Sequence, residues 1–184
     1  MKKFIILLVI IILALIAYIM RDKFLPGKNS IVPTTTQSSG NNFHPDPSSA
    51  TFTLDDESIT LSKGHNQKTL PGTGFVEETT LLDKFAYGDL NADGKQDTVL
   101  FLLSSGAGSG TFLYVAAYVS GPVNYKGSLG TFLGDRVAPE SISIKSGVVT
   151  VNYLDRKPDE AFAAEPTIKV SKQFVYKNGE LVEK

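Results

Sequence analysis

The feature that most limits the fold of this chain is an alternation of polar and apolar residues that runs from Thr51 to the C-terminus. Turn-forming residues interrupt the alternation every few positions. A period of two places successive side chains on opposite faces and is typical of half-buried β-strands. Residues 50–61 therefore predict two short strands around Asp55 to Glu57, and residues 141–154 predict a hairpin. Asn178-Gly179 separates two further alternating runs, which is the strongest short-range hairpin signal in a sequence.

Two apolar runs lie between these hairpins, "DTVLFLL" at 97–103 and "TFLYVAAYV" at 111–119. They are rich in β-branched and aromatic residues, which favours central strands over amphipathic helices. The glycine-rich stretch between them lacks the Lys-Ser/Thr of a phosphate loop and the G-x-S-x-G of a nucleophile elbow, so we interpret it as a hairpin connection. The fold prediction is a mainly β domain, an antiparallel sandwich or curled sheet of roughly eight to ten strands. Minor helix is expected at 77–86 and 158–165, where Pro158 suits a first helical position.

The N-terminus has a different pattern. Phe4 to Met20 carry no charge, and Lys2 and Lys3 precede them. At 1.5 Å per residue this segment reaches roughly 25 Å, the short end of a transmembrane helix. Residues 1–23 therefore predict a signal anchor with its N-terminus in the cytoplasm and the rest of the chain outside. A cleaved signal peptide and a secreted protein is the alternative, although no A-x-A site follows the apolar core.

Residues 24–50 are rich in proline, serine and threonine, which predicts a flexible tether before a domain at 51–184. The alternative is an arm packed on the domain surface, to which Ile31, Val32 and Phe43 would contribute. The chain has no cysteine, so disulfides and thiolate chemistry are excluded. Its formal net charge is −1 and no basic stripe is present, so no nucleic acid partner is expected.

The sequence "DLNADGKQD" at 89–97 has the pattern of a calcium loop. A hard cation takes six to eight oxygen ligands, and a chain supplies several of them only by folding tightly around the ion. Side-chain oxygens at loop positions 1, 3, 5 and 9, a carbonyl at 7 and a glycine at 6 achieve this. The predicted ligands are Asp89, Asn91, Asp93, the Lys95 carbonyl and Asp97, with Gly94 at the sharp turn. The alternative is a solvated polar turn, because Asp, Asn and Gly are favoured in turns.

With its flanks, the stretch 85–101 resembles the calcium loop of FG-GAP repeats, the integrin α-chain type. The resemblance implies that Asp89, Asn91, Asp93 and Asp97 bind a structural Ca²⁺ and tie two strands together. It does not extend to an EF-hand, because Leu100 stands where a bidentate glutamate is needed. The loop occurs once, so a repeat-built propeller is not predicted. The order of this loop, "GSGTF" and "LGDR" is also similar to uncharacterised membrane-anchored bacterial domains.

The sequence thus predicts a membrane-anchored, extracytoplasmic, calcium-binding module that binds or scaffolds a protein or glycan, and not an enzyme. An envelope glycan hydrolase is the first alternative, with carboxylates among Asp135, Asp155, Asp159 and Glu160. Ion pairing of Asp135 with Arg136 and of Asp155 with Arg156 is the simpler interpretation of those acids. A purely structural envelope component is the second alternative.

Overall fold

The structure is a computed structural model, and it describes residues 43–184 except 107 and 162. The predicted membrane segment and residues 24–42 of the predicted tether lie outside the described residues. Within the described part, no helix has the length and apolar character needed to cross a membrane.

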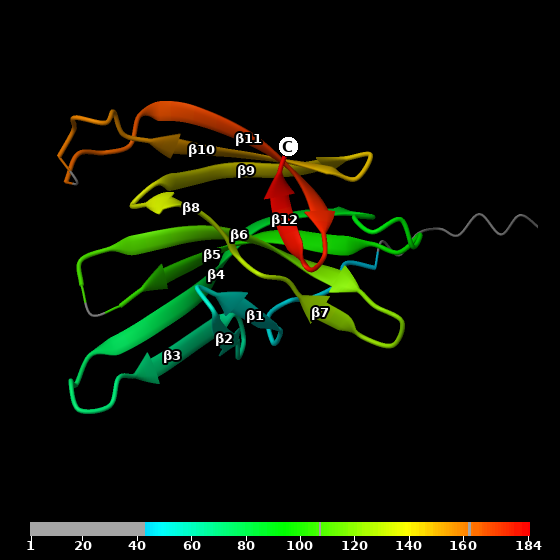
Figure 1. The fold of residues 1–184 in the computed structure, drawn as a ribbon, viewed down its shortest axis with the longest axis horizontal. Helices are drawn as coiled ribbons and strands as arrows, with labels where there is room; N and C mark the ends of the chain where they lie inside the picture. The colour runs from blue at the N-terminus through cyan, green and yellow to red at the C-terminus, as the bar shows by residue number, and fades with distance from the viewer. Residues whose placement is uncertain (1–42, 107, 162) are drawn as a thin grey trace, which may run out of the picture. The chain divides into compact units, whose positions relative to one another are not determined.

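The described residues form β-strands joined by turns (Figure 1). The strands are β1 (Thr51–Leu54), β2 (Glu57–Thr60), β3 (His65–Thr69), β4 (Val76–Gly88), β5 (Asp97–Ser105), β6 (Thr111–Ser120), β7 (Tyr125–Gly127), β8 (Thr131–Asp135), β9 (Ala138–Lys145), β10 (Val148–Asp155), β11 (Ile168–Lys177) and β12 (Glu180–Glu183). The strand ladders are antiparallel. The prediction of a mainly β, antiparallel domain is therefore confirmed, with more strands than expected.

The strands make three layers. A six-stranded sheet has the order β3-β4-β5-β6-β7, with β8 also paired to β6, and a four-stranded sheet has the order β12-β11-β10-β9. The β1–β2 hairpin forms its own small ladder. Figure 1 shows β9, β10 and β11 above β5 and β6, and the β1–β2 hairpin below those two strands.

The main core lies between the two larger sheets. Val99, Phe101 and Val115 from β5 and β6 pack with Val151 and Phe174 from the four-stranded sheet, and all are at most 1% exposed. Burying a side chain of this size contributes roughly 1.5–3 kcal/mol. The alternating pattern of β10 follows from this arrangement, because one face of the four-stranded sheet covers the core and the other meets solvent.

A second core lies on the other face of the six-stranded sheet. Phe52 and Leu54 of β1 cover Leu100, Leu102 and Ala116 there. Because both faces of β5 are covered, every residue from 97 to 102 is buried. This double burial is the physical reason that "DTVLFLL" is a continuous apolar run rather than an alternating one.

The two predicted helices are wrong, because the described residues contain no helix. Residues 77–86 belong to β4, which pairs with β3 on one side and β5 on the other. A helix there would remove β4, one of the two hydrogen-bonding partners of β5. The β4–β5 ladder therefore outweighs the local preference of these residues for a helix. Residues 158–161 and 163–165 lie in turns and irregular structure, with Glu160 N–H donating to the Lys157 carbonyl and Ala164 N–H to that of Ala161.

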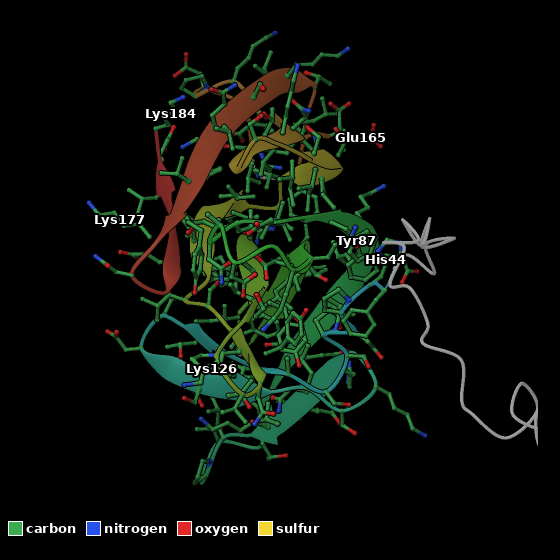
Figure 2. The ribbon with its side chains drawn as sticks, turned by 90° about the vertical axis from the view of Figure 1, so that its right-hand side faces the viewer. His44, Tyr87, Lys126, Glu165, Lys177 and Lys184 are labelled. Atoms are coloured by element: carbon green, nitrogen blue, oxygen red, sulfur yellow. The ribbon has the colours of Figure 1, made fainter. Side chains whose placement is uncertain are left out.

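Residues 43–50, the end of the predicted tether, pack on the domain. The fully buried Thr98 hydroxyl donates to the Pro45 carbonyl at 2.7 Å, and both Pro45 and Pro47 are buried. His44 stacks on Tyr87 with 3.8 Å between ring centroids, and Figure 2 shows the two side chains together. Among the described residues, burial therefore begins at Pro45, six residues before Thr51, whereas Phe43 is 65% exposed.

Candidate functional site

The acidic loop connects the adjacent strands β4 and β5, so the pairing of those strands fixes both of its ends. Gly88 pairs with Asp97 at the base of the loop. A Cβ on Gly88 would lie 2.9 Å from Cγ2 of Ile144 on β9. Any residue larger than glycine at this position would therefore push the two larger sheets apart. Gly94 has φ of 81°, and Ala92 has φ of 60° although it carries a side chain. The sharp turn at Gly94 is the one that a glycine at position 6 of a calcium loop provides.

The outer carboxylates of the loop accept hydrogen bonds from its own backbone. Asp89 accepts the N–H of Asp93 at 3.2 Å on one oxygen and the N–H of Gly94 at 2.9 Å on the other. The Asn91 side-chain oxygen accepts the Asp93 N–H at 3.1 Å, and Asp93 accepts the N–H of Lys95 at 2.9 Å. These bonds hold the loop in a tight turn with its amides directed inward.

Asp97 occupies a different position, beneath the loop. Its side chain is fully buried. One carboxylate oxygen accepts the Leu90 N–H at 2.8 Å, and the other accepts the N–H of Ser120 at 2.8 Å. A buried carboxylate is costly unless hydrogen bonds compensate it, so Asp97 joins the loop to the end of β6.

Ser120 is the centre of the hydrogen-bond network. Its Oγ lies 2.6 Å from Asp93 Oδ2 and 2.9 Å from Asp97 Oδ1. Its carbonyl accepts the Asn91 amide at 2.9 Å. A hydroxyl has only one proton to donate, so it satisfies one of the two carboxylates at a time. Two carboxylates therefore compete for a single hydroxyl proton at this point.

Negative charge exceeds positive charge around the loop. Lys95 Nζ is 3.9 Å from Asp93 Oδ2, and within the described part of the chain no ion pair reaches Asp89 or Asp97. The Ser120 hydroxyl, with the Lys95 N–H next, lowers the pKa of Asp93 below its ordinary value. Burial, followed by the charges of Asp97 and Asp93, raises the pKa of the nearby Tyr125.

The predicted ligand residues lie in one loop, but their carboxylates do not form a compact cluster. Among residues 43–106, 108–161 and 163–184, no three His, Cys, Asp or Glu side chains gather in a way that could hold a metal ion. Asp89 and Asp93 face backbone amides on the exposed side, whereas Asp97 lies below them. An open hollow of about 370 Å³ borders the loop, lined by Asn91, Asp93, Lys95, Ser120, Gly121 and Pro122.

Three of the four acids considered for hydrolysis, Asp135, Asp155 and Glu160, accept backbone N–H groups at turns. Asp135 accepts the Thr111 N–H at 2.9 Å and pairs with Arg136 at 2.8 Å, as the sequence predicted. Asp155 accepts the backbone N–H of Arg156, while that guanidinium donates to the carbonyls of residues 135 and 136. Glu160 accepts the Lys157 N–H at 3.0 Å.

Ser120 is the residue of this site that sequence reasoning missed. It lies 23 residues after Asp97, and an isolated serine carries no motif. The register of the β5–β6 hairpin is the signal that locates it, because Thr98 pairs with Tyr118 and places Ser120 beside the start of β5.

We compared the chain with models of protein families, with characterised proteins and with solved structures, and none of them matched.

Proposed function

We propose that this chain is a membrane-anchored, extracytoplasmic β-domain that binds or scaffolds an outer protein or glycan, and that one calcium ion at loop 89–97 braces it. The anchor rests on the uncharged segment 4–20 and the lysines before it. The calcium site rests on the loop pattern and on one structural observation.

That observation is the shortage of protons around Ser120. Asp93 and Asp97 both approach its Oγ within 2.9 Å, and a single hydroxyl proton serves only one of them. A divalent cation beside Asp93 offsets the remaining repulsion between the two carboxylates. Among residues 43–106, 108–161 and 163–184, the one ion pair at Asp89, Asp93 and Asp97 is that of Asp93 with Lys95, so the loop keeps a net negative charge that attracts a cation.

The hydrogen bonds within the loop leave room for an ion. A carboxylate oxygen carries two lone pairs, so an oxygen that accepts one N–H retains a second for a cation. Asp89 is half-buried and Asp93 is exposed, and each keeps such lone pairs beside its N–H bonds. Calcium suits such a site better than magnesium, because it tolerates irregular geometry and takes more protein oxygens.

The expected contribution of the ion is modest. At an ion concentration about ten times the dissociation constant, binding to the folded state alone adds roughly 1.4 kcal/mol. For a domain of about 140 residues this corresponds to a rise in Tm of roughly 3–6 °C. The ion therefore acts as a brace for the β4–β5 connection and not as a condition for folding.

Thermal unfolding of the full chain in mild detergent tests the calcium site. Tm is measured with millimolar Ca²⁺, with the same concentration of Mg²⁺ and with a chelator, for the parent, Asp93→Asn and Asp83→Asn. Asp83 is an exposed acid on β4 outside the loop, so its variant controls for the charge change. We expect Ca²⁺ to raise Tm in the parent and in Asp83→Asn but not in Asp93→Asn. Equal Tm values with Ca²⁺ and chelator in the parent would show that the loop is a polar turn.

A further inference from the structure

A second site lies on the other side of the six-stranded sheet, at the turn of the β1–β2 hairpin. Two hollows of about 210 and 260 Å³ meet there. Asp55, Phe112 and Tyr114 line both. None of these residues belongs to the acidic loop or contacts it, so the two sites are separate.

Aromatic rings form one wall of this site. Phe132 on β8 is 52% exposed and Phe112 on β6 is 37% exposed, although both are large apolar side chains. The Phe132 ring lies 6.2 Å from that of Phe112 and 5.5 Å from that of Tyr114. Gly110 supports the arrangement, because a Cβ there would lie 2.5 Å from the Phe112 ring. The rings therefore present π-faces and edges to solvent beside a carboxylate.

The opposite wall is acidic. The hollow of about 210 Å³ is lined by three acids, Asp55, Glu57 and Glu77. Lys68 is the one cation among its lining residues. Lys68 forms an ion pair with Glu57, and the charge of Glu77 also raises its pKa. One ammonium among three carboxylates leaves a net negative charge. Because opposite charges attract and like charges repel, this wall favours a positively charged ligand.

The backbone holds Asp55 at the junction of the two walls. Asp55 and Asp56 have φ of 47° and 68°, and they form the tight turn between β1 and β2 without a glycine. Such conformations are uncommon for residues other than glycine and are often found at functional positions. The Tyr114 hydroxyl donates to Asp55 Oδ2, which orients the carboxylate and leaves Oδ1 available to a ligand.

We propose that this site binds an organic cation of the guanidinium or ammonium class, held between the Asp55 carboxylate and the rings of Phe112 and Phe132. A carboxylate forms its strongest hydrogen bonds with such cations, and aromatic faces attract them through the ring quadrupole. The cation reaches the site either as the basic side chain of a peptide segment or as a free small molecule, and both present the same chemistry to Asp55.

Isothermal titration calorimetry on the full chain in detergent tests this proposal, with the peptide Gly-Gly-Arg-Gly-Gly as the probe. The same peptide with citrulline in place of arginine is the neutral twin, because citrulline has nearly the same shape without the charge. We expect the arginine peptide to bind and the citrulline peptide to bind roughly tenfold more weakly or not at all. Equal binding of the two peptides, or failure of the arginine peptide and of the free cation agmatine alike to bind, overturns the proposal.

Two variants and a matched control locate the binding. Asp55→Asn retains an oxygen to accept the Tyr114 hydroxyl and is expected to weaken binding roughly tenfold or more. Phe132→Ala removes a half-exposed ring and is expected to weaken binding about two- to tenfold. Asp56→Asn makes the same charge change one residue away, outside the lining of either hollow, and is expected to leave affinity unchanged. A loss in Asp56→Asn equal to that in Asp55→Asn refutes a specific site.

Agmatine, a free small molecule that carries a guanidinium and an ammonium group, distinguishes the two sources of the ligand. Tighter binding of the arginine peptide than of agmatine supports a basic protein segment as the occupant, and equal binding supports a free cation. Failure of these titrations leaves the calcium experiment unaffected, because Asp93 and Asp55 belong to different sites.

Discussion

Replacing Asp97 with asparagine is the sharpest test of how the acidic loop is held. In the parent, one carboxylate oxygen accepts the Leu90 N–H and the other accepts the backbone N–H and hydroxyl of Ser120, all within 2.9 Å. Asparagine has nearly the same shape but only one acceptor oxygen. Its amide nitrogen must therefore face at least one N–H donor that it cannot pair.

The magnitude follows from these contacts. Losing a hydrogen bond to a charged group costs about 1.5–3 kcal/mol, and leaving a buried donor unpaired costs about 1–3 kcal/mol. The two terms overlap, so we expect Asp97→Asn to lower the free energy of unfolding by about 2–4 kcal/mol. With an unfolding entropy of about 2.1 cal/mol/K per residue over about 140 residues, Tm falls by roughly 7–13 °C.

Urea and thermal unfolding followed by circular dichroism measure this loss. A chelator is present throughout, so that any bound ion contributes nothing to the difference. Asp89→Asn is the matched control, because Asp89 accepts two N–H bonds at the exposed side of the same loop. We expect that variant to cost less than about 1 kcal/mol. A loss below about 1 kcal/mol for Asp97→Asn, or equal losses in the two variants, would refute the assignment of Asp97 as the buried support of the loop.

Two other features give measurable expectations. Thr98→Val removes the hydroxyl that donates to the Pro45 carbonyl. We expect the free energy of unfolding to fall by about 1–2 kcal/mol and the Ser48 amide to exchange faster. Unchanged exchange at Ser48 would mean that the bond does not hold residues 43–50 on the domain. Burial and then the Asp55 carboxylate raise the pKa of Tyr114. Its neutral phenol therefore stabilises the folded state fully below about pH 10 and loses that contribution as pH rises from there through the folded pKa. The urea midpoint should therefore fall above about pH 10 and fall less in Tyr114→Phe. Parallel pH profiles for the two proteins would contradict this.

The sequence predicted the hairpins well because their turns are encoded locally. Asn178 and Gly179 have φ of 54° and 92°, the pair of positive values that a two-residue hairpin turn requires. Ser146 and Gly147 behave in the same way between β9 and β10. The two apolar runs were also placed correctly as central strands, because burial on both faces leaves a continuous apolar signal.

The errors arose where distant residues decide the structure. Residues 77–86 contain a capping threonine and helix-forming leucines, but their pairing with β3 and β5 determines their conformation. Pro45 and Pro47 suggested a tether by composition, whereas both are buried and the Thr98 hydroxyl, more than fifty residues later in the chain, donates to the Pro45 carbonyl. Ser120 likewise reaches the loop residues only because the β5–β6 register places it beside them. The loop residues themselves were identified from spacing alone, and their affinity for calcium stays a prediction.

The attachment of Pro45 to Thr98 has a mechanical consequence. A pulling force that enters the domain at residue 43 first meets the His44–Tyr87 stack on β4 and then reaches β5 through the Pro45–Thr98 bond. β5 is hydrogen-bonded along both edges, to β4 and to β6. Tension along β5 must shear two ladders at once rather than open one bond at a time, so the domain receives load through its most strongly connected strand.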